Sequence, residues 1–275
     1  MLTLVEAISL AGDRAKQNDD ACGFAGARAW VIDGATDFHK DKLTGAASDA
    51  AWLAHSANAH LHAVQGGVLR DVVRDVSEVA AEAYARIAKP AAERWMLPIA
   101  SLLMVEEEAE GLSGIDLGDC RLFALDADGN AQIAGGPGDA GDNETQLAAQ
   151  QTDGDKPLLD RTDTMKVLRA NRAAMNRPGA PWTFGLDPTC ADEARVWTLT
   201  IKRPAHVLLL TDGFSSLVDR YRVYDAGGSV RAALDKGLQE LAREIRAIEN
   251  EDAGGAAHPR FKKSDDATAL LLRLT

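Results

Sequence analysis

Four short acidic motifs are spread almost from end to end of this 275-residue chain. They are Asn18-Asp19-Asp20, Asp33-Gly34-Ala35-Thr36, Thr211-Asp212-Gly213 and Asp265-Asp266-Ala267-Thr268. Carboxylates that converge from distant segments repel one another unless protons or cations compensate their charge. Hard divalent cations prefer such oxygen ligands. The motifs therefore predict a carboxylate-bound Mg²⁺ or Mn²⁺ site assembled from the whole chain.

Two of these motifs directly follow apolar runs that have the composition of β-strands. Asp33 comes after residues 29–32, and Asp212 comes after residues 207–211. A strand that ends in a carboxylate can hold a ligand at a fixed point. The first and last motifs are about 245 residues apart, so a site that uses both requires a domain closed by its C-terminal strand. We predict a single domain over residues 1–275.

The elements that must position these carboxylates follow from hydrophobic periodicity and turn residues. The predicted strands are 2–10, 21–24, 28–32, 101–105, 111–117, 120–125, 131–134, 195–201, 206–211 and 267–274. The predicted helices are 44–64, 69–87, 156–175 and 230–248. Turn residues at Gly118-Asp119 and Asp128-Gly129-Asn130 predict an antiparallel meander between residues 101 and 134. Strands clustered together, with helices grouped between them, indicate an α+β fold.

One long segment lacks the apolar residues that would anchor it to a core. Residues 135–155 are rich in Gly, Asp and Gln, which predicts a mobile loop. Residues 135–180 together are expected to form a flap-like insertion that shapes access to the site.

Composition limits the partners and the compartment. A net charge of −12 disfavours nucleic acid and anionic membranes as partners. Three widely spaced cysteines (Cys22, Cys120 and Cys190) are typical of free thiols in a reducing compartment. The first residues do not resemble a signal peptide, and no segment approaches the roughly 18 apolar residues that span a membrane. We expect a soluble, cytoplasmic monomer.

Five motifs, taken in order, resemble those of the PP2C (PPM) family of metal-dependent serine/threonine protein phosphatases, in their bacterial form. The matching segments are Gly12 to Asp20, Val31-Ile32-Asp33-Gly34, Leu117-Gly118-Asp119-Cys120-Arg121, Leu209 to Phe214 and Asp265-Asp266-Ala267-Thr268. Each motif alone is weak because Asp-Gly is common in turns. Five in the right order over nearly the whole chain form a specific signal.

The resemblance implies a fold, a cofactor and a reaction. The family fold is a four-layer α/β/β/α sandwich, with two packed antiparallel sheets flanked by helix pairs. It carries two Mg²⁺ or Mn²⁺ ions, with a third in some members. A hydroxide that bridges the ions attacks the phosphoserine or phosphothreonine ester of a phosphoprotein substrate. The activity implied is that of a protein phosphatase acting in signalling.

The motif match also implies roles for individual residues. Asp33 would bridge both metals, and the Gly34 carbonyl would ligate one of them. The other ligands would be Asp212 and Asp265 on one metal, Asp20 or Asp19 on the other, and Asp119 on a third. Asp33, Asp212 and Asp265 would be the catalytic residues, and Arg14 would bind phosphate.

The chain departs from the family pattern around the phosphate-binding residues. Ala35-Thr36-Asp37 follows Asp33-Gly34 where the family usually has any residue and then a glycine pair, and Ala35 stands in place of the His that some members use as a general acid. His39 could take that role, although a surface loop His is the favoured interpretation. Arg14 is one residue further from Asp20 than in the family pattern. A bulge, a use of Asp19 in place of Asp20, or a role for Lys16 would each account for the difference.

A last departure is Asp266, which replaces an Asn and is either an extra charge or a turn cap.

Three other interpretations compete with this resemblance. Cys22 and Arg28 have the C-x5-R spacing of cysteine phosphatases, but Arg28 leads directly into a strand and nothing nearby would activate the thiol. The segment from Val31 to Thr36 is similar to a haloacid-dehalogenase nucleophile loop, but Ala35 replaces the second Asp and a parallel sheet is not expected. The third alternative is a catalytically silent PP2C-like domain that binds phosphoproteins or regulates a partner.

Overall fold

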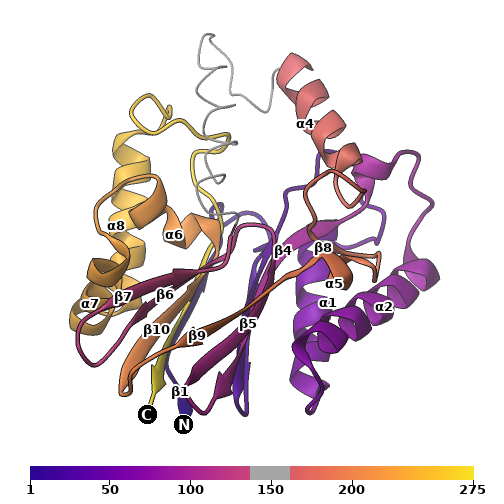
Figure 1. The fold of residues 1–275 in the computed structure, drawn as a ribbon. Helices are drawn as coiled ribbons and strands as arrows, with labels where there is room; N and C mark the ends of the chain where they lie inside the picture. Colours follow the sequence, from indigo (N-terminus) through magenta and orange to yellow (C-terminus); the bar gives the residue numbers. More distant parts are fainter. Residues whose placement is uncertain (137–161) are drawn as a thin grey trace.

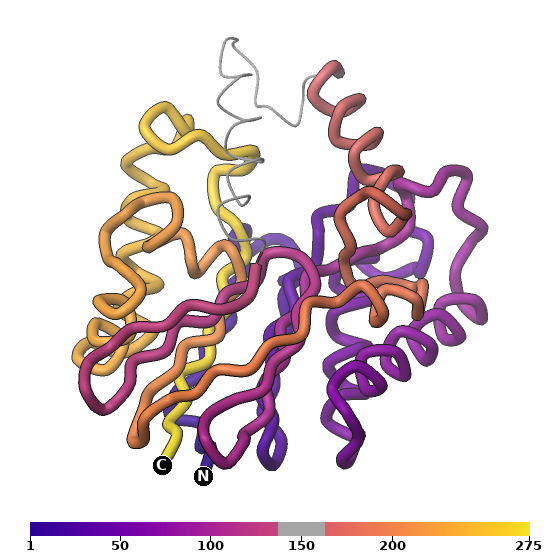
Figure 2. The backbone as a smooth tube through the Cα atoms, in the orientation of Figure 1, coloured from indigo at the N-terminus to yellow at the C-terminus, as the bar shows by residue number. Residues whose placement is uncertain are grey.

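The computed structural model describes residues 1–136 and 162–275 of the chain, and two antiparallel sheets form its centre (Figure 1). The strand order of the first sheet is β1 (Leu2–Leu10), β11 (Ala267–Leu274), β10 (Ala205–Leu210), β6 (Arg121–Leu125) and β7 (Ala131–Ala134). The order of the second is β2 (Ala21–Ala25), β3 (Arg28–Gly34), β4 (Ile99–Glu108), β5 (Gly111–Leu117) and β9 (Arg195–Thr200), and β8 (Phe184–Gly185) also pairs with β4. The two chain ends lie side by side because β1 and β11 are paired along their whole length (Figure 2).

Helices cover the outer face of each sheet (Figure 1). The helices on the second sheet are α1 (Asp49–Ala63), α2 (Leu69–Ile87) and the short α5 (Cys190–Glu193). The helices on the first sheet are α6 (Asp212–Asp219), α7 (Ala226–Lys236) and α8 (Leu238–Glu251). Helix α4 (Thr162–Ala174) contacts the short 3₁₀ turn η1 (Arg94–Met96). The predicted four-layer α/β/β/α sandwich is confirmed.

Strand β3 shows why the layers form. Trp30 and Ile32 pack among side chains of α1 and α2, whereas Ala29 and Val31 pack against the first sheet. Successive side chains of a strand point to opposite faces, so a strand buried on both faces must be apolar throughout. All four side chains are buried, and the strand therefore holds the residue at its end in a fixed position.

Two predictions about the elements were wrong. The expected meander is divided between the sheets: β4 and β5 pair in the second sheet, β6 and β7 pair in the first, and the chain crosses between them at Gly118-Asp119. Gly118 has φ +85°, a turn conformation that serves a hairpin and a crossover equally. The single helix expected over 230–248 is two helices, α7 and α8, because the chain turns at Gly237 with φ +83°.

Other features bear on the surface and on the remaining predictions. The loop predicted over 135–155 lies outside the described residues, apart from 135 and 136. No helix in the described parts of the chain is long and apolar enough to cross a membrane.

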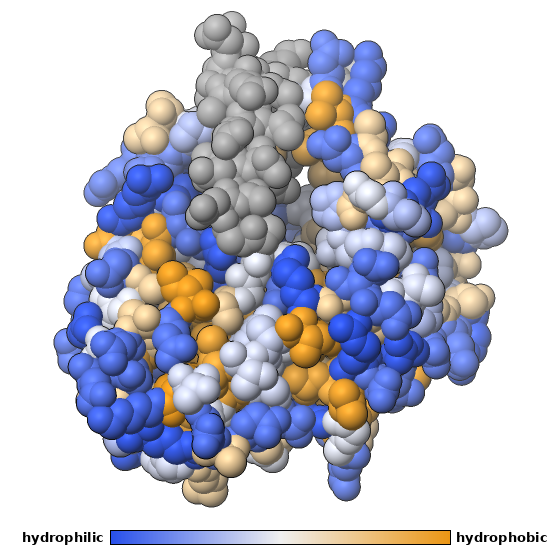
Figure 3. Space-filling view, viewed as in Figure 1, coloured by the Kyte–Doolittle hydropathy of each residue, from blue (hydrophilic) through white to orange (hydrophobic). Residues whose placement is uncertain are grey.

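Separate hydrophobic patches lie between hydrophilic ones on the face that includes β7 and β9 (Figure 3). Ile133 and Val196, one on each of these edge strands, are more than half exposed.

Candidate metal and phosphate site

Asp33 lies near the C-terminal end of β3, next to a glycine that a larger residue could not replace. A Cβ atom on Gly34 would lie 2.4 Å from the backbone oxygen of Asp19. Carbon and oxygen atoms do not approach so closely, so Gly34 allows the Asp19-Asp20 segment to pack against the end of β3. Gly34 therefore allows the first acidic motif, Asn18-Asp19-Asp20, to pack against the second motif at Asp33.

Four other carboxylates surround Asp33. Burial raises the pKa of Asp33 well above its ordinary value, and the negative charges of Asp20, Asp212, Asp119 and Asp265 raise it further, in that order. The backbone N–H of Asp212, at the start of α6, donates to Oδ2 of Asp33 over 3.3 Å. Four of these five carboxylates come from the four acidic motifs of the sequence, and Asp119 comes from a fifth segment.

Three neighbours of Asp33 have a partner: hydroxyl groups bind Asp20 and Asp119, and Lys262 pairs with Asp265. Asp20, at 2% exposure, accepts a hydrogen bond from the Thr211 hydroxyl over 2.8 Å. Burial raises the pKa of Asp20 well above its ordinary value despite this bond, and the charge of Asp266 contributes. Asp119 accepts a 2.6 Å bond from the Ser101 hydroxyl on β4. These bonds orient the carboxylates without neutralising them.

Asp19 is bound by α1 rather than by a residue beside Asp33. The Ser48 hydroxyl, at the N-cap of α1, donates to Oδ1 of Asp19 over 2.5 Å. Burial is the main cause that raises the pKa of Asp19 to about 6. Between the two residues that the sequence left open, Asp20 is therefore the one beside Asp33.

Asp266 joins the ends of the chain around this site. Its carboxylate accepts hydrogen bonds from the backbone N–H groups of Gly12, over 2.7 Å, and of Asp19, over 2.6 Å. These bonds join segments far apart along the chain, so they are not a turn cap. Asp266 also acts as an extra charge, because it raises the pKa of Asp19 and of Asp20. It fixes the Asp19-Asp20 segment against β11.

A cavity of about 130 Å³ opens beside the carboxylates. Its lining combines Asp33, Asp119, Asp212 and Asp265 with Gly34, Ala35, Thr36, Phe38, Ser101, Leu168, Arg172, Arg220, Pro259, Arg260, Phe261 and Lys262. Arg14 and Lys16 are exposed and do not belong to this lining. The structure thus gathers Asp33, Gly34, Asp119, Asp212 and Asp265 at one cavity, with Asp20 behind Asp33, and leaves Arg14 outside it.

The cationic residues of the cavity were missed by sequence reasoning. Arg172 extends from α4, donates to the Thr36 carbonyl over 2.8 Å and stacks over the Phe38 ring at 4.2 Å. Lys262 lies in the loop before β11, and its Nζ is 2.8 Å from Oδ1 of Asp265. Neither residue lies in a recognisable motif, so no local signal in the sequence marked them.

Asp265 is the carboxylate that its neighbours keep ionised. Burial alone would raise the pKa of Asp265, but the charge of Lys262 and its hydrogen bond outweigh burial and lower that pKa below its ordinary value. The pKa of Lys262 is correspondingly raised above its ordinary value, because its contact with Asp265 outweighs its own burial. The centre therefore contains an ion pair, Lys262 with Asp265, beside carboxylates that repel each other.

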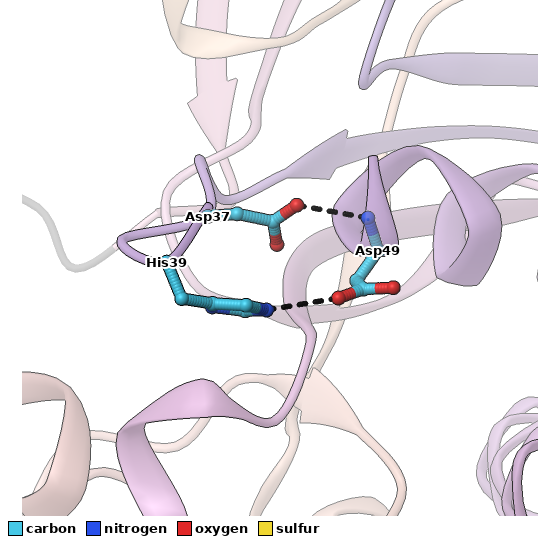
Figure 4. A group of neighbouring side chains, drawn as sticks. All are labelled: Asp37, His39 and Asp49. Atoms are coloured by element: carbon cyan, nitrogen blue, oxygen red, sulfur yellow. Dashed lines mark hydrogen bonds and ion pairs between the residues drawn. The ribbon is translucent and has the colours of Figure 1, made fainter. Parts of the chain in front are cut away.

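A second acidic group, beside the cavity, is a hydrogen-bond network (Figure 4). Among the described residues, Asp37, His39 and Asp49 are the only three whose potential metal-ligating atoms all lie within 4.8 Å. Asp49, in the first turn of α1, already accepts bonds from the backbone N–H groups of Leu43 and Thr44 and lies 2.9 Å from Nε2 of His39. These donors lower the pKa of Asp49 although burial opposes them.

The same network accounts for the position of the His39 side chain and for the attachment of the loop after β3 to α1. Lys42 pairs with Asp37 over 2.8 Å, so one of the two carboxylates of the group has a cationic partner. The His39 side chain is only 7% exposed, and the interpretation of it as a surface residue was wrong. His39 is not among the residues that line the cavity, and its visible role is to hold this loop to α1.

The carboxylate group around Asp33 is suited to divalent metal ions. Its donors are oxygen atoms only, which match Mg²⁺ and Mn²⁺ rather than softer metals. The repulsion that raises the pKa of Asp33 is the charge imbalance that such cations relieve. The residues that would hold them are Asp33, Asp20, Asp119, Asp212, Asp265 and the Gly34 carbonyl.

The structure argues against both competing phosphatase chemistries. Burial, with the charge of Asp20, raises the pKa of the Cys22 thiol to about 11, the reverse of what a nucleophilic cysteine needs. Arg28 donates to the Gly66 carbonyl over 2.7 Å and pairs with Glu106. These groups occupy its guanidinium, so Arg28 does not provide the phosphate-binding cation that a cysteine phosphatase needs beside its thiol. Every strand pair in the described residues is antiparallel, which excludes the parallel sheet of the dehalogenase type there.

Comparison with known proteins agrees with the architecture. No sequence model of a protein family matches the chain, and no curated protein matches it. Solved structures do match: the serine/threonine phosphatase PstP/Ppp of Mycobacterium tuberculosis is 17% identical with a TM-score of 0.58, over 99% of this chain and 98% of that one. The catalytic domain of PstP in complex with two manganese ions is 18% identical (TM-score 0.55), over 99% of both chains.

A third structure carries the family name. The PPM Ser-Thr phosphatase MsPP from Mycobacterium smegmatis, in complex with cacodylate, is 18% identical with a TM-score of 0.55, over 99% of this chain and 100% of that one. At such identities the likeness shows the fold. The chain has the fold of PP2C (PPM) phosphatases over its full length, as its motif order indicated.

Proposed function

We propose that this protein is a metal-dependent phosphatase that hydrolyses phosphoserine and phosphothreonine esters on proteins. The observation that carries the proposal is the gathering of four carboxylates around Asp33 at a cavity that cationic side chains also line. PstP, which shares the fold, has been solved with two manganese ions, and RsbX has been solved with magnesium. The fold and the site both support metal-dependent hydrolysis of a phosphate ester.

The residues divide the work of the reaction. Bound Mg²⁺ or Mn²⁺ ions would supply an activated water and neutralise charge on the phosphoryl group. Asp33, Asp20, Asp212 and Asp265 would hold these ions, and Asp119 would hold a further one. Among the cations at the cavity, Arg172 is carried by α4, so phosphoryl oxygens can be bound there by a guanidinium that does not come from the first acidic motif.

The apolar part of the lining suits an ester on a peptide. Phe38, Leu168 and Phe261 lie at the cavity beside the cationic residues. Apolar side chains around a phosphate site can contact the residues that flank a phosphorylated side chain and exclude water from the reacting bond. We therefore propose a phosphoprotein as substrate and do not assign a particular one.

The test is hydrolysis of p-nitrophenyl phosphate, and then of phosphoserine, phosphothreonine and phosphotyrosine peptides, with Mn²⁺ or Mg²⁺. We expect turnover that EDTA abolishes and that Asp33→Ala reduces by about 100-fold or more. The matched control is Asp128→Ala, which removes an exposed carboxylate in the turn between β6 and β7 and should retain activity. No turnover with either metal, together with binding of the phosphopeptides, would instead support a silent phosphoprotein-binding domain.

A further inference from the structure

Lys262 is a cation placed inside the carboxylate centre. It lines the cavity, its Nζ lies 2.8 Å from Oδ1 of Asp265, and about a third of its side chain is exposed. The charges of Asp212 and Asp33 also act on it. An ammonium at this distance occupies one of the directions from which Asp265 could bind a metal ion.

The backbone on both sides of Lys262 is fixed. Arg260 pairs with Asp252 over 2.9 Å and donates to the Glu249 carbonyl over 3.2 Å, at the end of α8. After Lys262, the carbonyl of Asp265 accepts a 2.8 Å bond from Arg246. The anchored loop keeps the lysine at the centre, while its four-carbon stem can rotate between positions.

A divalent cation and the ammonium cannot share the same carboxylate oxygen without strong repulsion. Either the ion binds only to the remaining oxygens, or it displaces the ammonium. A displaced Lys262 would stay within the cavity, because its backbone is anchored there. Arg14, which the family pattern assigns to phosphate, is exposed and outside the cavity.

We propose that Lys262 is an internal counter-cation of this centre, which a metal ion displaces from Asp265 and which then binds the phosphoryl oxygens of the substrate. This inference rests on the proposed function. It assigns to Lys262 two successive partners, the Asp265 carboxylate without metal and the phosphate group with metal.

Metal binding is the first test, because it does not depend on turnover. Titration calorimetry with Mn²⁺, and the electron paramagnetic resonance signal of free Mn²⁺, should be compared for wild type, Lys262→Met, Lys262→Arg and Lys263→Met. Lys263 is the exposed neighbour in the same loop, so its variant removes an equal charge without the contact to Asp265. We expect Lys262→Met to tighten the weaker Mn²⁺ site about tenfold, and the other two variants to stay within about twofold of wild type.

Phosphate recognition is the second test. Inhibition by inorganic phosphate in the presence of saturating Mn²⁺ should weaken about tenfold in Lys262→Met, and the KM for p-nitrophenyl phosphate should rise by a similar factor. Lys262→Arg retains a cation and should restore most of both. Circular dichroism and the thermal midpoint establish that each variant is folded, and Lys262→Gln replaces the Met variant if the latter is not.

The outcomes separate this inference from the proposed function. Unchanged or weaker Mn²⁺ binding in Lys262→Met, compared with Lys263→Met, overturns the displacement. Unchanged phosphate inhibition overturns the second role. Only this inference fails if wild type binds Mn²⁺ and hydrolyses the ester, while Lys262→Met and Lys263→Met have the same Mn²⁺ affinity and the same phosphate inhibition. If wild type neither binds Mn²⁺ nor turns over, the proposed function fails with it.

Discussion

Asp252 holds the loop that carries Lys262 and Asp265, and the strength of this anchor can be measured. Its carboxylate, 13% exposed, pairs with Arg260 over 2.9 Å and accepts bonds from the backbone N–H groups of Ala256 and His258 over 2.8 and 2.9 Å. Burial opposes ionisation, but these bonds, together with one from the Ala257 N–H, lower the pKa of Asp252 to about 2. An ionised Asp252 therefore stabilises the folded state.

The magnitude follows from this pKa shift. A fall from 3.8 to about 2 corresponds to about 2.4 kcal/mol of unfolding free energy at neutral pH. Because the folded-state pKa is the lower one, this stabilisation is complete above the ordinary pKa near 4 and is lost as the pH falls towards 2. At pH 3 about half of it, roughly 1.3 kcal/mol, remains.

Substitution of Asp252 by Asn removes the charge and keeps the shape. We expect Asp252→Asn to lower the unfolding free energy by about 2–3 kcal/mol at pH 7 and by about 1 kcal/mol at pH 3. Urea denaturation at pH 7, 5 and 3 measures both values. The matched control is Asp128→Asn, whose exposed pair with Lys202 is screened by solvent, so that the urea midpoint should stay at the wild-type value at each pH.

A loss that is equal at all three pH values would refute the assignment to an ionised Asp252. A loss below about 0.5 kcal/mol at pH 7 would refute the anchor itself. In either case the fixed position of Lys262 would need another explanation.

The metal site and its surroundings support three further predictions. Mn²⁺ at about 100 times its dissociation constant should raise the thermal midpoint by about 5–10 °C, EDTA should reverse the rise, and Asp33→Asn should abolish it; an equal rise in this variant would contradict the role of Asp33. Gly34→Ala should cost about 1–3 kcal/mol in urea denaturation, because its Cβ would meet the Asp19 carbonyl oxygen at 2.4 Å, and an unchanged midpoint would contradict that contact. Arg172→Met should raise the KM for p-nitrophenyl phosphate about tenfold with a smaller effect on kcat; equal losses in both would show instead that the bond to Thr36 shapes the site.

Much of the fold could be predicted because single elements carry a local pattern. The helix over residues 69–87 and the strands over 2–10, 111–117 and 267–274 have the bounds that the sequence predicted. Their apolar residues recur at the periods of a helix or a strand, and burial of those residues determines the element. The pairing of β5 with β9 and of β6 with β10 depends on long-range packing, so the division of the meander between two sheets was beyond local reasoning.

The candidate site divides in the same way. The order and spacing of the acidic motifs placed Asp33, Asp212 and Asp265 at the ends of strands, and the structure brings them to one cavity. The choice between Asp19 and Asp20 could not be made from adjacent residues with the same side chain. It depends on Ser48 and Thr211, which bond to one each and lie 29 and 191 residues away along the chain.

The sequence by itself predicted that carboxylates from across the chain share a cation, because their charge and their positions beside apolar strands are local properties. Only the tertiary structure decided which cations share the cavity with them. Arg172 reaches the cavity from α4, and Lys262 reaches it from the loop before β11. A basic residue lies at such a site because folding brings its segment there. Neither periodicity nor a motif indicates which distant segments of the chain come together.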